Sequence, residues 1–457
     1  MARRRDQRHP HPRRTTRTPA RRHPAPTPGR PPVTPTSRIF SSLHVGNYRL
    51  YFTGQLISMA GTWMQAVALA FLVLHLTGSG TQLGLATAIR FLPVLLLSPL
   101  GGVVADRVDK RRLIFLTQTL LGALAGLFAL LIATGLIRLW SVYLLSLALG
   151  CLTAFDNPTR QSFIPEVVPR EELANAVTLN SVSINFSRVL GAAAGGAIVA
   201  ALGFATCFAL NAASFAAVVL TLALMRTSRL NPAPPARKEP GQVRAGLRYA
   251  AGTPELLVPL VLITVIGTLA WEFQVTLPLI ARETFGGDAR TYGWMASMMG
   301  VGAVVGGLIT AYRGNPGRAR TLSTAAIGWG VAITAAAVAP TLPLALVAML
   351  FVGYGSISFN AIAKTALQLA AAPEMRGRVM ALWTLAWGGS TPIGGPIVGW
   401  IGETFGARWS LIAGGVPTIL IGLAALPALR AIDRVAANSR DPGVSRPREA
   451  PETRQPG

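Results

Sequence analysis

The sequence predicts an all-α integral membrane protein with twelve transmembrane helices, arranged as two halves of six. The first observation is composition, because 51% of the 457 residues are hydrophobic and only 13% are charged. A chain this long and this apolar does not fit a single soluble core. The second is that the chain holds twelve apolar runs, each near the length of about 20 residues that crosses a bilayer. The third is an internal repeat, described below. The runs are residues 49–76, 81–105, 113–134, 139–158, 173–202, 205–225, 256–280, 292–312, 319–340, 342–364, 376–402 and 408–430.

The polar segments set the expected boundaries. They are a tail over residues 1–38, a six-helix half over 39–225, a linker over 226–255, a second half over 256–430 and a tail over 431–457. Residues 1–38 contain eleven arginines and one aspartate among prolines and threonines, so we expect disorder there. Much of the net charge of +24 is concentrated in this tail and is not spread over the chain, as it would be in a nucleic-acid-binding protein. We interpret the tail as a solvated cytoplasmic leader and expect no nucleic-acid partner; contact of the tail with anionic lipid or nucleic acid is the alternative. In the linker, Val243, Leu247 and Tyr249 indicate a short amphipathic helix on the inner membrane surface.

The loops predict the orientation. With the N-terminus inside, the inner loops carry eighteen Lys and Arg residues and the outer loops four. Positive charge concentrates on the cytoplasmic side of membrane proteins. Both termini are therefore expected in the cytoplasm.

The two halves repeat one another. Three segments of the first half have a similar segment in the second half. Gly195–Gly203 corresponds to Gly394–Gly402, and Gly101–Gly102 before Arg107 corresponds to Gly306–Gly307 before Arg313. Pro169 corresponds to Pro373. Parallel repeats of six helices, related by an axis along the membrane normal, are the architecture of major facilitator superfamily (MFS) transporters.

The turn after the second span carries a related signature. Gly102, Asp106 and Arg107 resemble the MFS motif between the second and third helices, while Asp109 stands where that motif usually has glycine. A carboxylate is stabilised near a helix N-terminus. We therefore expect Asp106 to meet the start of the eleventh span, near Arg376 and Arg378, as a conformational latch.

A closer resemblance covers residues 40–430. Ala154–Pro169, with Leu173–Ala176 and Arg188–Gly191, resembles the enterobactin-exporter branch of the superfamily, which implies a transporter of the bacterial inner membrane. Gly191–Gly196 resembles the fifth-helix signature of exporting antiporters, with Ala192 in place of its proline. Glycines at this spacing let helices pack closely or rock against each other. The residues expected to pack or gate in this way are Gly191, Gly195, Gly196, Gly394 and Gly395.

Ionisable residues within membrane spans are costly and usually face a cavity. Arg90 and Arg188 are expected to line one wall, and Glu272 the opposing half. Polar side chains beside the arginines complete the expected substrate cavity: Gln55, Asn180 and Asn185. Glu272 is interpreted either as the proton-coupling carboxylate or as the partner of an arginine across the bundle. Asp156 and Lys364 are interpreted as surface charges at inner helix ends.

These features predict a secondary transporter rather than an enzyme. It would export a small amphipathic compound, such as a siderophore or drug, in exchange for protons, and act as a monomer in the lipid bilayer. No Walker-type phosphate loop is present, and no cofactor or metal site is expected. Cys151 and Cys207 lie in apolar runs and are expected to be core residues. Two alternatives remain: an uptake permease of the same fold, and a membrane-anchored binding or sensor protein that uses the arginine-rich tail.

Overall fold

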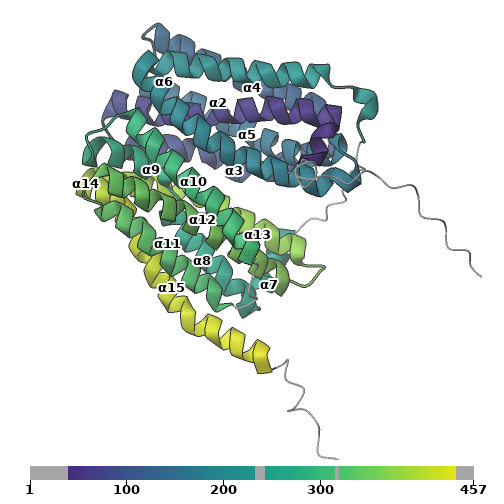
Figure 1. Ribbon diagram of the computed structural model, residues 1–457, viewed down its shortest axis with the longest axis vertical. Coiled ribbons are helices and arrows are strands. Elements are labelled where there is room, and N and C mark those ends of the chain that lie inside the picture. The colour runs from purple at the N-terminus through teal and green to yellow at the C-terminus, as the bar shows by residue number, and fades with distance from the viewer. Residues whose placement is uncertain (1–39, 232–241, 314–318, 439–457) are drawn as a thin grey trace, which may run out of the picture. The chain divides into compact units, whose positions relative to one another are not determined.

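The structure is a computed structural model that describes residues 40–231, 242–313 and 319–438. The expected tail over residues 1–38 lies outside these ranges. The second expected tail, residues 431–457, is described only as far as Asn438, and this part continues helix α15. The described residues form helices and no strand (Figure 1). The α-helices are α2 (Gly46–Thr77), α3 (Gly80–Arg107), α4 (Lys110–Ala133), α5 (Leu139–Val167), α6 (Leu173–Leu224), α7 (Gln242–Ala251), α8 (Pro254–Ala270), α9 (Phe273–Leu279), α10 (Ala289–Arg313), α11 (Arg320–Val338), α12 (Leu342–Ala370), α13 (Arg376–Gly388), α14 (Thr391–Phe405) and α15 (Ala407–Asn438).

Among the described residues, ten helical segments are long and apolar enough to cross a membrane. One of them contains two crossings, because α6 parallels α2 and then returns along it. Before Gly203, Ser187 Oγ donates to the Leu56 carbonyl at 3.1 Å. After Gly203 the order reverses, with Cys207 near Met64 and Asn47 bonded to Arg226. Gly203 has φ +81° and ψ 176°, a conformation that favours glycine, so the two arms are separate crossings.

The predicted eleventh span is formed by two short helices. Helices α13 and α14 have 13 and 15 residues and are each too short to span alone. They join at Gly389 and Ser390 and together occupy the predicted eleventh span. The seventh span is also interrupted, because α8 ends before Trp271 and α9 starts at Phe273, with Glu272 between them. Counted this way, the described helices can accommodate the twelve crossings that the sequence predicts, whereas ten segments have the length and hydropathy of a span by themselves.

The two halves also repeat in their packing. Gly150 of α5 lies against the carbonyl of Arg90 in α3, and Gly353 of α12 lies against that of Met299 in α10. A Cβ at either glycine would overlap that carbonyl, so the close approach requires glycine.

Antiparallel crossings give the bundle two ends. We call them the Gly78 end, with the Gly203 turn and the loop at Gly406, and the Lys110 end, with Glu166 and Arg226. At the Lys110 end the buried Lys110 Nζ lies 2.6 Å from Glu166 Oε1. Asp109, which departs from the MFS motif, caps α4 there by accepting from the Arg112 amide at 3.0 Å.

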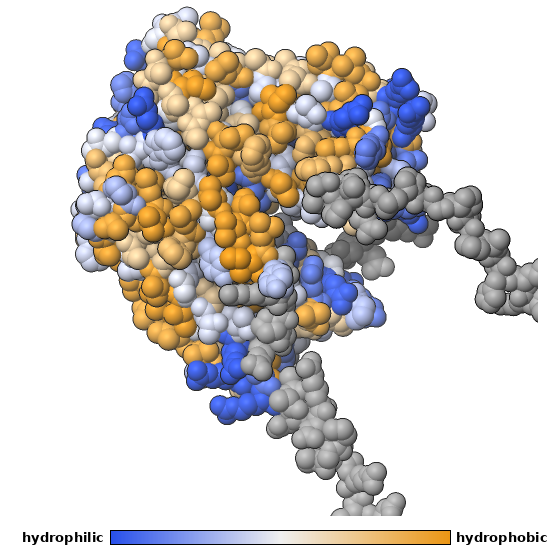
Figure 2. All heavy atoms as spheres, viewed as in Figure 1, coloured by the Kyte–Doolittle hydropathy of each residue, from blue (hydrophilic) through white to orange (hydrophobic). Residues whose placement is uncertain are grey.

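The surface agrees with a membrane protein. Figure 2 shows apolar side chains over the middle of the helices, with hydrophilic ones near their ends, for instance at the end of α15. Large apolar side chains such as Leu130, Leu308 and Phe351 are exposed. Such surfaces are unusual on soluble monomers but are covered by lipid in a bilayer.

Candidate functional site

The first wall of the candidate cavity is a buried polar network that joins α2, α4 and α5. Asp156 is 2% exposed, and its Oδ1 accepts from Thr117 Oγ1 at 2.7 Å and Gln118 Nε2 at 2.9 Å. Its Oδ2 lies 2.8 Å from Arg160 Nε, one turn further along α5. Arg160 Nη1 in turn donates to Gln55 Oε1 on α2 at 2.7 Å. A buried ion pair is retained in this way when further hydrogen bonds satisfy its charges.

This network corrects two expectations. Asp156 is buried and not a surface charge, and the fourth span does not end at Pro158, as its expected bounds of 139–158 imply, because α5 continues to Val167. Pro158 cannot donate to the Ala154 carbonyl four residues earlier, and Gly101 of α3 packs against that carbonyl instead. Arg160, which is one of the eighteen charges assigned to the inner loops from the sequence, therefore lies inside α5. Lys364 is exposed as expected, with Nζ 5.3 Å from the Trp383 ring.

Arg188 lies on the first arm of α6, next to α2. Its Nη2 donates to Asn185 Oδ1 at 3.0 Å, and its guanidinium carbon lies 5.8 Å from the Trp63 ring centre. Its buried Nε has no hydrogen-bond acceptor. Asn180, two turns earlier, is half-buried. The structure thus brings Arg188, Asn185 and α2 together, and their role in a substrate cavity stays a prediction.

Arg90 lies on α3, on the other side of the first half. Its guanidinium carbon is 5.6 Å from the ring centre of Phe91. Tyr292 of the second half lies within electrostatic range of it and stacks on Phe71 with ring centres 6.0 Å apart. Arg90 therefore sits where the two halves meet.

Glu272 lies at the break between α8 and α9 and is 2% exposed. The Thr391 side chain, at the start of α14, makes a hydrogen bond to the carboxylate, while Oε1 has no hydrogen-bond partner. A Cβ at Gly394 would lie 3.0 Å from Oε1, so α14 closes over the carboxylate. The break in the seventh span thus places a carboxylate against the eleventh.

Arg90, Arg188 and Glu272 are not paired with one another in the part of the chain that the structure describes. Three ion pairs form among the described residues, and Arg90, Arg188 and Glu272 belong to none of them. The interpretation of Glu272 as the partner of an arginine across the bundle therefore finds no ion pair in the described part of the chain. In the same part of the chain, no group of three or more His, Cys, Asp or Glu side chains converges as a metal site would.

The expected latch residues lie at the Lys110 end. Asp106 is half-buried near the end of α3, and Arg107 is exposed. Arg376 Nε donates to the Gln368 carbonyl at 3.0 Å, and Arg378 Nη1 lies 3.3 Å from Met375 Sδ. Gly102 is half-buried one turn before Asp106. A contact between Asp106 and the start of α13 stays a prediction.

A latch of the same chemistry, missed by the sequence reasoning, lies at the Gly78 end. Glu403 of α14 accepts from Ser79 Oγ at 2.7 Å and from the Thr81 amide at 2.9 Å, at the N-terminus of α3. Carboxylates are stabilised at such helix N-termini. The contact joins the two halves, and the only local signal was an acidic residue at the end of the eleventh span.

Glycines hold the halves together beside this contact. Gly84 of α3 lies against Gly395 of α14, and Gly196 of α6 lies against Ala289 at the start of α10. The other three glycines expected to pack or gate lie within one half: Gly191 against Ala60, Gly195 against Met64 and Gly394 against Thr268.

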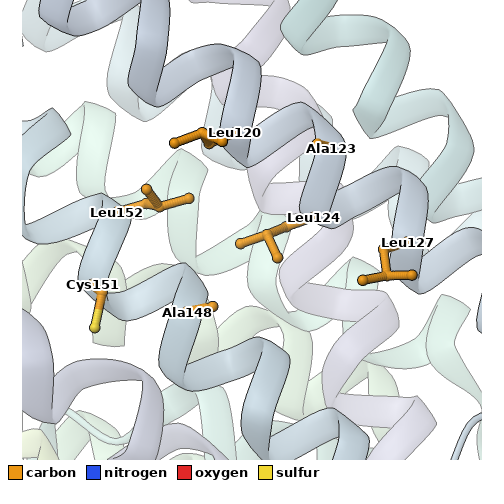
Figure 3. Close-up of a pocket in the computed structure, with 7 residues that line it drawn as sticks. All are labelled: Leu120, Ala123, Leu124, Leu127, Ala148, Cys151 and Leu152. Atoms are coloured by element: carbon orange, nitrogen blue, oxygen red, sulfur yellow. The ribbon is translucent and has the colours of Figure 1, made fainter.

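Two apolar grooves flank α4 and contain none of the candidate arginines or Glu272. The first, of about 380 Å³, lies between α4 and α5 (Figure 3). Its lining is Leu120, Ala123, Leu124, Leu127, Ala148, Cys151 and Leu152. The second, of about 410 Å³, lies between α4 and the second arm of α6. Their linings suit hydrocarbon chains rather than a polar substrate. Cys207 is buried as expected, whereas Cys151 lines the first groove.

Known proteins are similar to this chain in sequence. Enterobactin exporter EntS of Shigella boydii serotype 18 is 26% identical over 388 residues, which is 84% of this chain and 91% of that protein. Uncharacterized MFS-type transporter YfiS of Bacillus subtilis is 25% identical over 264 residues, 57% of this chain and 62% of that protein.

Two solved structures show the same fold. Peptide transporter POT in complex with sulfate superposes with a TM-score of 0.70 at 13% identity, covering 87% of this chain and 99% of that one. A bacterial homolog of the human lysosomal transporter Spinster, inward-facing and unoccupied, gives 0.65 at 14% identity, with 86% and 97% covered.

Residues 37–451 match the family described as transmembrane secretion effector. This chain is therefore a multi-pass transporter of the bacterial inner membrane, not an enzyme, and it belongs to the transmembrane secretion effector family of the major facilitator superfamily.

Proposed function

We propose that the chain is a secondary exporter that moves a small amphipathic anion out of the cell and takes up protons in exchange. The observation that carries the proposal is the charge pattern of the membrane core. Arg90 and Arg188 have no carboxylate partner in the described part of the chain. An uncompensated guanidinium in a membrane is costly, and an anionic substrate would balance it.

Glu272 supplies the group that exchanges a proton. Arginine stays protonated at every working pH, so Arg90 and Arg188 attract a substrate but do not carry the proton. Glu272 is buried at a helix break, with Oε1 unpaired and α14 closed over it. A buried carboxylate that alternates between neutral and ionised states as the cavity opens to each side couples proton movement to transport.

In the proposed transport cycle, the two ends of the bundle close in turn. Glu403 and the contact between Gly84 and Gly395 join the halves at the Gly78 end. In the orientation proposed from the loop charges, this end is outside, and the cavity opens to the cytoplasm. The opposite state closes the Lys110 end, where Asp106 meets the start of α13.

A siderophore of the catecholate class suits this site, because phenolates supply negative charge on a largely aromatic body. The relatives named as enterobactin exporters support this choice of first substrate. Trp63 and Phe91, each beside one of the two arginines, offer faces for aromatic groups.

The test is transport of enterobactin by inverted membrane vesicles that contain the full chain. We expect accumulation when respiration acidifies the lumen, and loss of accumulation when an uncoupler dissipates the gradient. Vesicles without the protein are the control. Uptake that the uncoupler leaves unchanged would contradict proton exchange, and flux only out of the vesicles would identify an uptake permease.

A further inference from the structure

One face of α5 is polar within the membrane. Thr153, Asn157 and Arg160 follow one another at helical spacing and are all half-buried. Ala148, Cys151 and Leu152, on a different part of the same helix, line the apolar groove beside α4. A polar stripe on a membrane helix faces protein or water rather than lipid. Arg160 therefore lies toward the interior of the transporter.

Arg160 has hydrogen-bond donors that are not used within the protein. Its Nε bonds to Asp156, and one N–H on each terminal nitrogen bonds to Gln55 and Asn157. A guanidinium has five N–H groups, so two remain. The Arg160 side chain is 21% exposed, whereas that of Asp156 is 3% exposed. The accessible side of this buried pair is therefore the cation.

Gln55 adds a second unused donor. Its Oε1 accepts from Arg160, which fixes the orientation of the amide, and its Nε2 has no acceptor although the residue is 3% exposed. A buried donor without an acceptor is unfavourable, and most such groups in proteins find a partner. The Gln55 amide and the free N–H groups of Arg160 thus adjoin one another without an oxygen to receive them.

The position also fits the proposed cavity. Ser187 Oγ donates to the carbonyl of Leu56, the residue after Gln55. The backbone of Arg188, the next residue on α6, therefore flanks α2 near Leu56, and its guanidinium lies beside Trp63, about two turns along α2 from Gln55. Both arginines thus contact α2, Arg160 at Gln55 and Arg188 at Trp63.

We propose that Arg160 and Gln55 form an anion-binding subsite of the transport cavity. The subsite takes a carboxylate, phenolate or phosphoryl oxygen of the substrate and acts together with Arg188. Asp156 is a positioning residue, because its bonds to Thr117 and Gln118 hold it where it orients Arg160. This inference rests on the proposed transport function and identifies the substrate class as an anion.

The test measures charge preference, not transport. The full-length protein in nanodiscs is titrated with 2,3-dihydroxybenzoate and with its neutral amide, 2,3-dihydroxybenzamide. A hydrogen bond to a charged group favours the anion, so we expect the wild type to bind it about tenfold or more tightly than the amide. Arg160→Gln should lose this preference while its affinity for the amide stays within about twofold.

Three further variants sharpen the result. Arg170→Gln removes an exposed arginine ten residues along the chain and should leave both affinities unchanged. Arg160→Lys keeps the charge without the planar fork and should restore part of the preference. Asp156→Asn should weaken the preference, because Arg160 is then poorly held.

Two outcomes overturn the proposal. One is a wild type that binds the two probes equally or binds neither. The other is an Arg160→Gln protein that keeps the preference or loses affinity for both probes equally, which indicates a structural role. Because binding is measured without a gradient, failure of proton-driven export in vesicles would contradict the proposed function and leave this result standing.

Discussion

The contact of Glu403 with the start of α3 predicts a shift between the two open states. Glu403→Gln removes the charge that accepts from Ser79 Oγ and the Thr81 amide. Glu403 is exposed, so solvent screens this interaction. A carboxylate at an exposed helix N-terminus is worth about 0.3–1 kcal/mol. We take about 1 kcal/mol, which changes the ratio of the two states about fivefold.

A cysteine reporter measures this ratio. Thr87 is buried on α3, one turn beyond Gly84, and we expect it to become accessible from the Gly78 end when that end opens. In a background without Cys151 and Cys207, Thr87→Cys is labelled on intact cells with an impermeant thiol reagent. We expect Glu403→Gln to label about fivefold faster than the parent, because the open state is more populated.

The control is Glu171→Gln, which removes an exposed carboxylate at the opposite end of the bundle, away from α13. It should leave the labelling rate at Thr87→Cys unchanged. An unchanged rate in Glu403→Gln, or an equal rise in both variants, would refute the reasoning that Glu403 holds the Gly78 end closed.

Three further predictions concern orientation, the second latch and stability. Cysteines at Gly78 or Gly203 should react with an impermeant thiol reagent from outside and a cysteine at Asp109 should not; the reverse pattern would overturn the proposed orientation. Asp106→Asn should weaken transport without reducing membrane insertion, and unaltered cysteine accessibility at both ends would contradict its role as a latch. Lys110→Met removes the ammonium from a buried carboxylate and should lower the free energy of unfolding by about 3 kcal/mol, measured by thermal unfolding in detergent; an unchanged midpoint would show that the pair contributes little.

Much of the fold could be predicted from the sequence because membrane spans leave a strong local signal. Apolar length alone located the crossings, and Gly203 was correctly placed between two of them, where the structure shows positive φ. Arg90, Arg188 and Glu272 could be identified because a charge inside an apolar run is conspicuous without knowledge of its neighbours.

The site details depended on contacts between residues far apart in the chain. Asp156 and Pro158 resemble a turn locally, yet hydrogen bonds from α4 and the ion pair with Arg160 keep the segment helical and buried. The spacing of four residues between Asp156 and Arg160 was the available signal. Nothing local links Glu403 to Ser79, because the two residues meet only when the halves pack.

The most direct test of the central claim is proton-driven transport by Glu272→Gln. Gradient-driven uptake of external enterobactin is measured in inverted vesicles whose lumen is acidic. Downhill exchange of enterobactin without a pH gradient is measured in parallel. The account predicts that Glu272→Gln loses gradient-driven accumulation but keeps downhill exchange, because the substrate contacts remain and only the titrating group is removed. Full gradient-driven accumulation by Glu272→Gln would contradict the account and show that the proton is carried elsewhere or that another ion drives transport.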